Sequence, residues 1–525
     1  MDPCRTRTAH IRTWDRSDHP LGADLYDIPT AVLVEARRPD HSVKKQAAVT
    51  SNRCISDRAC YSKSINDDQN SVRKITRSMN TVNQKDKAKP STQHPEHFSG
   101  THVEIDPGRS PVKSFFKLLG PGLITGASDD DPSGIATYST AGASFGYATL
   151  WTAIITLPLM AVVQFMCAKI GLASGRGLAG VLRHYYPRTI LYPAVLCLVV
   201  ANTINAGTDI GAIAAAINLI IPIPITALIV PIALIIVALQ IWGSYRLIAN
   251  VFRWLTLSLF AYIAAAFLAK PNWDEVIRAT FIPTLRFDRE YLLTLVAILG
   301  TTISPYLFFW QASEEVEEEI NEGRKSVRQR KGVTDAELKK AKWDTIVGMF
   351  FCNIVFYFVI LAAGATLHAP GKTDIQSASD AAQALQPIAG SAATYLFAVG
   401  IIGAGFLAVP VLTGSSVYAV AETFGWRYGL NTKPRQARQF YAVIAISTLI
   451  GTLTNFVGIN PISALFWTAV INGLLSPPLL VIIMLISNNK KVMGNAVNGQ
   501  FTNIVGWATT LIMFAAAIGM LATSR

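Results

Sequence analysis

Charged side chains are scarce in this 525-residue chain: they make up 15% of it, whereas 51% of the residues are hydrophobic. Soluble domains carry about 25% charged residues. The deficit falls after Ser110, where one apolar run follows another. A membrane-crossing helix needs roughly 20 mostly apolar residues, whereas the strands of a membrane barrel are shorter and alternate in polarity. The run lengths therefore predict an all-α membrane protein.

Histidine, paired cysteine and catalytic motifs are also missing where an enzyme or a zinc protein would need them. Of eight histidines, only His184 and His368 follow residue 102, and both lie at the ends of apolar runs. None of the six cysteines has Cys-x-x-Cys spacing, so we expect neither a disulfide framework nor a zinc site. The chain has no phosphate-cradling loop and no nucleophile elbow. Nothing in the sequence supports enzyme activity or a bound cofactor.

Positive charge is present in excess, with a formal net charge of +12. A basic balance suggests nucleic acid as one partner, but here the basic residues lie in the N-terminal tail and in short loops, as the positive-inside rule explains. Residues 1–113 are polar, lack the apolar core of a signal peptide and predict a disordered cytosolic tail. We therefore expect the lipid bilayer as a partner and no nucleic acid.

Residues 114–525 form the expected transmembrane domain of about eleven helices. The spans are predicted at 117–145, 148–173, 189–219, 224–242, 246–269, 291–313, 343–367, 388–423, 437–457, 461–486 and 502–522. Basic loops alternate with loops of little net positive charge, and they lie at 175–188, 243–246, 323–342, 426–438 and 488–493. This alternation predicts a cytoplasmic N-terminus in the cell (inner) membrane. The sequence leaves the oligomeric state open.

The first span contains three consecutive carboxylates, Asp129, Asp130 and Asp131, followed by Pro132 and, two residues later, Gly134. Proline removes a backbone donor and interrupts a helix, so we expect unwinding over 131–134 with freed carbonyl oxygens. Acidic residues within a membrane are costly and usually functional. A carboxylate beside freed carbonyls is typical of a site for a hard cation.

A second interruption is predicted at Pro305 in the sixth span, which Gly300 precedes. The two interrupted spans are five spans apart, so they cross the membrane in opposite directions. This spacing predicts an inverted five-plus-five repeat over about 117–269 and 291–486, with 502–522 as an extra helix. In such transporters, broken helices frame a substrate site at the midplane.

Several motifs of this region resemble the NRAMP divalent-metal transporters. Asp131-Pro-Ser-Gly134 resembles the family's Asp-Pro-Gly-Asn break, and the resemblance extends over about 117–486. Further similarities are Gly142–Tyr147, Leu150-Trp151, Gln164, Gly171, Gly175-Arg176, Leu178-Ala179 and Ile210–Ala214. The resemblance implies a LeuT-type fold, with a metal site at Asp131, Ser133, Gly134, Thr301, Ser304 and Tyr306.

Within that site, Asp131 matches the family's metal-binding aspartate, and Thr301 matches the residue whose carbonyl binds metal. Gly134 replaces an asparagine ligand, whereas Ser304 and Tyr306 replace the methionine and histidine of the family's Met-Pro-His. Thioethers favour softer transition metals, and oxygen ligands favour Mg²⁺, Ca²⁺ and Mn²⁺. Because Mg²⁺ usually keeps several waters, the wider, oxygen-lined site predicts Mg²⁺ first and Mn²⁺ second. The pattern is similar to the NRAMP-related magnesium transporters.

Titratable groups of the family's proton route are replaced as well. Gln311 lies at the family's second histidine of the sixth helix, and Asn205 and Thr208 replace two acidic residues of the third, although Asp209 is adjacent. We therefore favour metal movement without proton coupling. The alternative function is an ion-coupled transporter of amino acids or other organic solutes on the same fold, and a third class is a receptor that signals through the tail.

Two other features have open interpretations. The glutamates at 314, 315, 317, 318 and 319 predict either a cation-attracting funnel or, with slight preference, a solvated helix end. Asn472, ahead of Ser476-Pro477-Pro478, predicts an interhelical hydrogen bond or an outer ligand of the metal.

Overall fold

The computed structural model describes residues 120–243, 257–430 and 432–523. The predicted tail and the first part of the fifth span lie outside these residues. All elements within them are helical. The part of the chain predicted as the first repeat contains α4 (Pro121–Asp129), α5 (Pro132–Phe145), α6 (Trp151–Ser174), α7 (Leu178–Tyr185), α8 (Arg188–Ile220), α9 (Ile225–Trp242), η1 (Leu257–Phe260) and α11 (Ala261–Leu268).

The later part of the chain begins with the surface helix α12 (Trp273–Phe281). It continues with α13 (Arg289–Thr302), α14 (Pro305–Asn321), α15 (Val327–Arg330), α16 (Asp335–Ala363), η2 (Gly364–His368), α17 (Ala378–Ala382), η3 (Gln383–Leu385), α18 (Gln386–Ala389), η4 (Gly390–Ala392), α19 (Ala393–Phe424), α20 (Arg438–Leu453), η5 (Thr454–Phe456), α21 (Pro461–Ser487), α22 (Lys490–Met493) and α23 (Gln500–Thr523).

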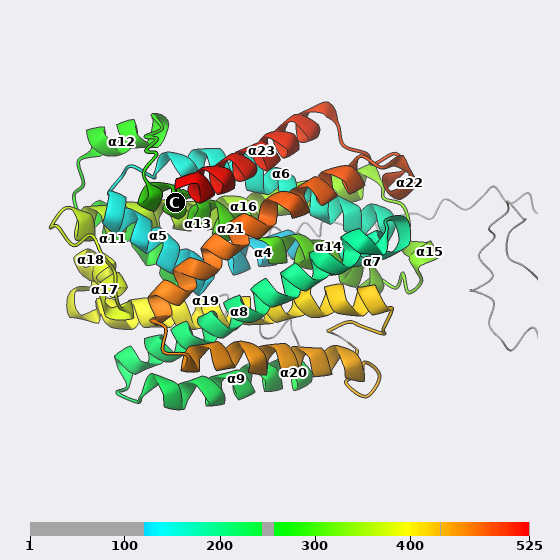
Figure 1. The fold of residues 1–525 in the computed structure, drawn as a ribbon, viewed down its shortest axis with the longest axis horizontal. Helices are drawn as coiled ribbons and strands as arrows, with labels where there is room; N and C mark the ends of the chain where they lie inside the picture. The colour runs from blue at the N-terminus through cyan, green and yellow to red at the C-terminus, as the bar shows by residue number, and fades with distance from the viewer. Residues whose placement is uncertain (1–119, 244–256, 431, 524–525) are drawn as a thin grey trace, which may run out of the picture. The chain divides into compact units, whose positions relative to one another are not determined.

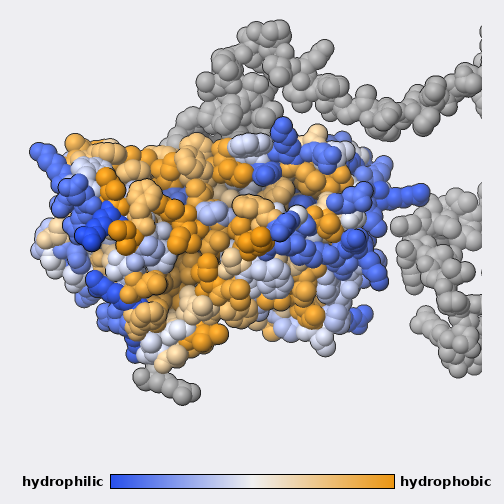
Figure 2. All heavy atoms as spheres, turned by 90° about the horizontal axis from the view of Figure 1, so that it is seen from above, coloured by the Kyte–Doolittle hydropathy of each residue, from blue (hydrophilic) through white to orange (hydrophobic). Residues whose placement is uncertain are grey.

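These helices confirm the predicted membrane fold. The described ranges contain nine helical segments that are long and apolar enough to cross a membrane. The remaining two predicted spans correspond to the pair α4 and α5 and to the segment that ends in η1 and α11. On the face that Figure 2 shows, apolar side chains cover the middle along the long axis, and polar ones gather at the two ends. The short elements α7, α15 and α22 lie at one of these ends (Figure 1), as the alternation of basic loops requires.

Two helices are interrupted, each immediately before a proline. Helix α4 ends before Asp130, and α5 begins after Asp131, which has an extended backbone with φ −72° and ψ 167°. Helix α13 ends before Ile303, and α14 begins after Ser304, with φ −80° and ψ 133°. The expected unwinding over 131–134 is therefore wrong in its extent. Pro132 starts α5, because proline fits the first turn of a helix, where its missing N–H is not needed.

Glycines let the halves of the interrupted helices pack closely on long neighbours. A Cβ on Gly126 of α4 would overlap the backbone at Gly348 of α16. In the same way, a Cβ on Gly300 of α13 would overlap the backbone of α21 at Ala469 and Gly473. Small residues are how membrane helices approach one another, because lipid provides no hydrophobic force between them. Both breaks are therefore held by a backbone crossing about one turn before the break.

Candidate metal site at the two helix breaks

Asp131 lies at the centre of the first break and is 1% exposed. Its Oδ1 accepts hydrogen bonds from the backbone N–H of Gly134 at 2.6 Å and from the hydroxyl of Ser133 at 2.8 Å. The carboxylate thus caps the positive end of α5, where a negative charge is stabilised. Ser133 is buried too. The sequence Asp-Pro-Ser-Gly builds this cap locally, since the cap, the first-turn proline and the freed amide follow one another.

The other oxygen of Asp131 faces helix α8. Asn205 donates from Nδ2 to Asp131 Oδ2 at 3.1 Å, and the same nitrogen lies 3.4 Å from Asp209 Oδ2. The side chains of Asn205 and Asp209 are fully buried, and each has one oxygen, Oδ1, that has no hydrogen-bond partner among the described residues. An unsatisfied buried oxygen is costly unless a ligand, a water or a proton completes it. Asn205 therefore connects two buried carboxylates and offers a further acceptor beside them.

The second break lies against the first. A Cβ on Gly134 would be 3.0 Å from Thr301 Oγ1 and 3.3 Å from Asp131 Oδ1, so these three residues meet at one place. Tyr306, on the first turn of α14, donates from its hydroxyl to the Ser128 carbonyl at 3.1 Å. The fold thus brings residues about 170 positions apart in the chain to the same buried volume.

Ser304 precedes α14 but does not cap it through its side chain. Its hydroxyl instead lies 2.8 Å from the carbonyl of Gly300 and 2.6 Å from that of Thr301, both in the last turn of α13. The Thr301 carbonyl, which the resemblance assigns to metal, therefore already accepts one hydrogen bond. A carbonyl oxygen has two lone pairs, so one remains for a cation.

The buried carboxylates have no basic partner. No ion pair between described residues includes Asp129, Asp130, Asp131 or Asp209. The described ranges also hold no group of three or more His, Cys, Asp or Glu side chains arranged to bind a metal. A cation at the breaks would therefore combine carboxylate with hydroxyl, amide and carbonyl oxygens and with water, which is a set that hard cations accept.

Cys352 of α16 is a neighbour of the first break that sequence analysis did not find. Its Sγ lies 3.0 Å from Asp129 Oδ2 and 3.5 Å from Asp130 Oδ1, and all three side chains are buried. Asp129 Oδ1 has no partner in the described structure. A lone cysteine in an apolar span gives no sequence signal, because only the packing of α16 on α4 brings it to the aspartates.

The glutamates after the second break differ from the expectation of a solvated helix end. Glu315, Glu317 and Glu319 are 5%, 6% and 2% exposed, because the last turns of α14 are enclosed by other helices. Gln311, one turn earlier, donates from Nε2 to Glu315 Oε1 at 2.9 Å and accepts from the Thr125 hydroxyl at 2.5 Å. Solvation of the helix end is therefore wrong for these three glutamates, and Gln311 connects α14 to α4.

Helix α21 also contacts the second break. The hydroxyl of Ser476 lies 2.7 Å from the Ile303 carbonyl, freed at the break, and 2.8 Å from the Asn472 carbonyl. Asn472 itself is buried one turn before. Ser476 is thus the residue of this helix that satisfies a freed carbonyl of the break.

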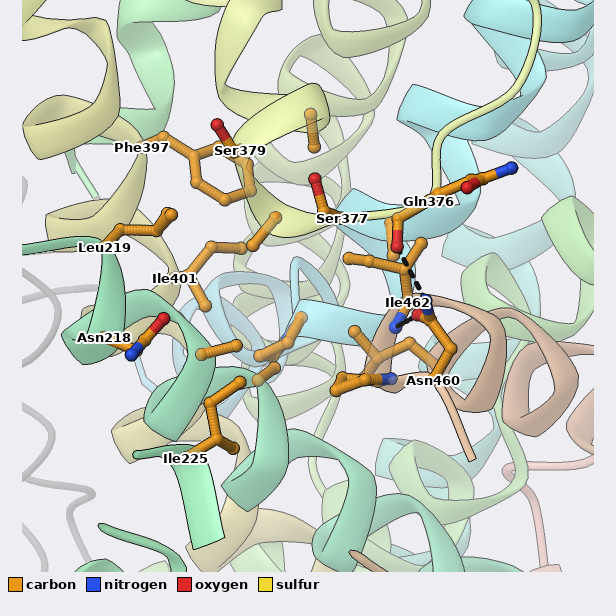
Figure 3. Close-up of a pocket in the computed structure, with 18 residues that line it drawn as sticks. Asn218, Leu219, Ile225, Gln376, Ser377, Ser379, Phe397, Ile401, Asn460 and Ile462 are labelled. Atoms are coloured by element: carbon orange, nitrogen blue, oxygen red, sulfur yellow. Dashed lines mark hydrogen bonds between the residues drawn. The ribbon is translucent and has the colours of Figure 1, made fainter. Parts of the chain in front are cut away.

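A pocket of about 340 Å³ reaches the first break from the end of the molecule where α8 ends and α9 begins. Apolar side chains line most of it, including Leu219, Ile225 and Ile401, and polar side chains such as Asn218 and Ser377 lie among them (Figure 3). Pro132, which follows Asp131, is one of the lining residues. The pocket therefore extends from one end of the molecule to the residue next to the buried carboxylates.

Comparison with known proteins places this geometry in a family. The family model "Natural resistance-associated macrophage protein-like" matches residues 122–523. A solved structure of the Eremococcus coleocola manganese transporter, in complex with an aromatic bis-isothiourea compound, is similar at 21% identity and a TM-score of 0.62, over 82% of this chain and 91% of that one. A mutant of that transporter is similar at 19% identity and a TM-score of 0.61, over 80% and 89% of the two chains.

These matches confirm the all-α, LeuT-type membrane fold with broken first and sixth helices. The family model covers most of the residues that the structure describes and includes both breaks. The family consists of transporters and not of enzymes. The chain belongs to the Nramp family of integral membrane transporters.

Proposed function

We propose that this transporter moves a divalent metal cation by alternating access, with Mg²⁺ as the first choice and Mn²⁺ as the second. The cation would bind at the two breaks, to oxygens of Asp131, Ser133, Thr301, Ser304 and Tyr306 and in the space left by Gly134. The observation that carries this proposal is the buried Asp131 carboxylate, which faces the second break and has no basic partner among the described residues. A mobile cation would complete its charge balance.

The buried acidic groups favour a cation over an organic anion. Asp129, Asp130 and Asp131 are consecutive and buried, and Asn205 connects Asp131 to the buried Asp209. A solute carboxylate bound there would be repelled by these like charges, which act strongly in a low-dielectric interior. Transport of amino acids or related solutes therefore stays the second candidate.

The oxygen-rich chemistry favours a hard ion. Ser304 presents a hydroxyl where a thioether would favour a soft metal, and the thiol of Cys352 lies against Asp129 and Asp130. Mg²⁺ demands oxygen ligands and keeps several waters, and every proposed ligand at the breaks is an oxygen. Mn²⁺ accepts the same oxygens, and the name of the similar solved transporter makes it the natural second choice.

The pocket beside Pro132 supplies a route for alternating access. It would be the outward vestibule if the basic loops and the N-terminus lie in the cytoplasm of a cell (inner) membrane, as their charge predicts. Inward release would then require the opposite end, around the buried glutamates of α14, to open. Both arrangements would use the same buried carboxylate.

Flux through purified protein in liposomes tests the proposed substrate. Mg²⁺, Mn²⁺ and Ca²⁺ influx should be measured separately with internal metal dyes, beside uptake of radiolabelled amino acids as the competing class. We expect saturable Mg²⁺ influx above that of empty liposomes, weaker Mn²⁺ influx and no amino-acid uptake. Amino-acid uptake without divalent flux would replace this proposal with the second candidate.

A further inference from the structure

A second pocket, of about 570 Å³, lies far along the bundle from the helix breaks, where α6, α14 and α19 end. Its lining includes the basic residues Arg176, Arg183, His184, Lys325, Arg330 and Arg427. We call it the basic pocket. Its lining shares no residue with the proposed metal site. The five arginine and lysine side chains around one hollow repel one another unless an anion is present.

The acidic side chain that lines the basic pocket already accepts hydrogen bonds from the backbone. Glu422 is the single acid among the described lining residues, and its two carboxylate oxygens accept the N–H groups of Gly177 at 2.7 Å and Gly180 at 2.9 Å. It thus caps the start of α7 instead of pairing with a base. Arg330 is committed too, because it donates to the carbonyls of Gly175, Arg324 and Lys325.

The remaining cations have no carboxylate partner. Among the described residues, the bases that form ion pairs are Arg324, Lys340 and Lys372. Within the described ranges, Arg176, Arg183, Lys325 and Arg427 form no ion pair with a carboxylate. Arg183 donates instead to the backbone carbonyl of Glu422 at 3.2 Å. Guanidinium groups match the paired oxygens of phosphate, and basic pockets between helices near a membrane surface are typical binding places for phosphorylated lipid headgroups.

Aromatic side chains indicate that this pocket lies at the level of the membrane surface. Trp426, which lines the pocket, stacks on Phe424 with ring centroids 5.2 Å apart. Phe424 is 56% exposed although it is apolar. Aromatic rings gather at the membrane–water interface, so an anionic headgroup would reach the basic pocket without leaving the bilayer.

We propose that the basic pocket binds a phosphate-bearing anion, supplied either by a phospholipid headgroup or by a soluble phosphate compound. The bound phosphate would connect the end of α14, through Lys325, to the end of α19, through Arg427. The two helices pack on each other, and α14 is the second half of the broken sixth helix. The proposal concerns binding alone and stands whether or not the transported ion is identified correctly.

The test compares two double variants of the full-length chain. Lys325→Gln with Arg427→Gln removes two exposed charges of the pocket that form no hydrogen bond through their side chains to described residues. Arg188→Gln with Lys491→Gln is the matched control, since both are exposed bases near the same end of the bundle that do not line the pocket. Thermal melting of both proteins checks folding, and Arg427→Gln alone serves if the pocket pair does not fold.

Binding is measured in detergent for phosphatidylglycerol, with phosphatidylcholine as reference, and separately for inorganic phosphate and inositol trisphosphate. We expect the pocket variant to bind phosphatidylglycerol at least about tenfold more weakly than wild type, since each base near a phospholipid surface contributes several-fold, while the control keeps wild-type affinity. The same dependence with inositol trisphosphate would identify a soluble source, and its absence a lipid source. Equal affinity in all three proteins, or equal loss in both double variants, would overturn the proposal.

Discussion

The two breaks have the same backbone layout, but the residue before the proline is charged at the first break and neutral at the second. In each, a helix stops, two residues adopt non-helical backbone and a proline starts the next helix. At the first break, the residue before the proline is Asp131, whose carboxylate caps the helix that follows. At the second, it is Ser304, whose hydroxyl turns back to the helix that precedes.

Because of this difference, we expect the two breaks to contribute differently to cation binding. The first break concentrates negative charge, and the second supplies neutral oxygens and no charge within its two non-helical residues, Ile303 and Ser304. A carboxylate sets the strength of binding, since removing a charge from a buried site costs more than removing a dipole. Neutral oxygens and the space around them set which ion fits. We therefore expect substitutions at the first break to change affinity and those at the second to change selectivity.

The largest expected effect is loss of the folded protein when the close helix crossing near either break is disrupted. Gly126→Val and Gly300→Val each place a side chain where backbone already lies, so the helices must separate. We expect a loss of more than about 4 kcal/mol in stability, beyond ordinary overpacking, seen as loss of the folded peak in size-exclusion chromatography. Gly499→Val is the matched control, because nothing lies within 4 Å of its added Cβ. Folded protein from both variants would contradict the close crossings.

Asn205 allows the first break to be weakened without removing its charge. Asn205→Ala removes the amide that donates to Asp131, so the carboxylate loses a fixed orientation. Partners of metal ligands typically contribute 10–100-fold to affinity, and we expect a loss of about that size for Mg²⁺ by calorimetry. Asn202→Ala serves as the control, because it removes a buried amide from the same helix that bonds Ser415, Ser416 and the Leu412 carbonyl instead. Equal losses in both variants would mean that Asn205 acts only on folding.

Ser304 tests the selectivity assigned to the second break. Ser304→Met restores a thioether, and we expect Cd²⁺ and Mn²⁺ binding to improve about tenfold relative to Mg²⁺, or roughly 1.4 kcal/mol. Ser304→Ala, which removes the hydroxyl without adding sulfur, should not show this gain. Gly134→Asn is then added, although its Cβ requires Thr301 Oγ1 to move. An unchanged preference in Ser304→Met would remove the ligand argument.

The smallest expected effect is a proton current that stays at zero. The resemblance matches Tyr306 and Gln311 to two family histidines, and both side chains form hydrogen bonds with α4, Tyr306 with the Ser128 carbonyl and Gln311 with the Thr125 hydroxyl. In liposomes with a pH dye, metal influx should proceed without matching acidification. Acidification that follows the metal would contradict uncoupled movement. Asp209→Asn would then test the buried carboxylate beside Asn205 as the relay.

Much of the fold was predictable because membrane-crossing helices can be recognised in a sequence from the length and polarity of their apolar runs. The spans and both breaks follow from apolar runs and from Pro132 and Pro305. The extent of the first break was predicted too long, since proline tolerates the first turn of a helix and Asp131 caps that turn. The start of α5 was therefore determined by Pro132 and the cap at Asp131, and the composition of the span alone does not predict it.

The contacts between distant segments were not predictable from one sequence. Cys352 lies more than 220 residues from Asp129, and no spacing rule connects them. The glutamates of α14 follow a polar pattern that suits a solvated helix, yet packing of neighbouring helices buries Glu315, Glu317 and Glu319. The proximity of Gly134 and Thr301 was expected only through the family resemblance. Tertiary packing, which propensity does not encode, accounts for these differences.

Removing the charge of Asp131 is the most direct test of the proposed cation site. Asp131→Asn keeps an oxygen that can cap α5 and removes the charge, whereas Asp288→Asn makes the same change at the exposed cap of α13, where Oδ1 accepts the Tyr291 N–H at 3.0 Å. Calorimetric titration of both proteins and wild type with Mg²⁺ distinguishes the loss of a metal ligand from the change of a helix cap. We predict no measurable Mg²⁺ binding to folded Asp131→Asn and wild-type binding to Asp288→Asn. Wild-type Mg²⁺ affinity in folded Asp131→Asn would contradict a cation site between the two breaks.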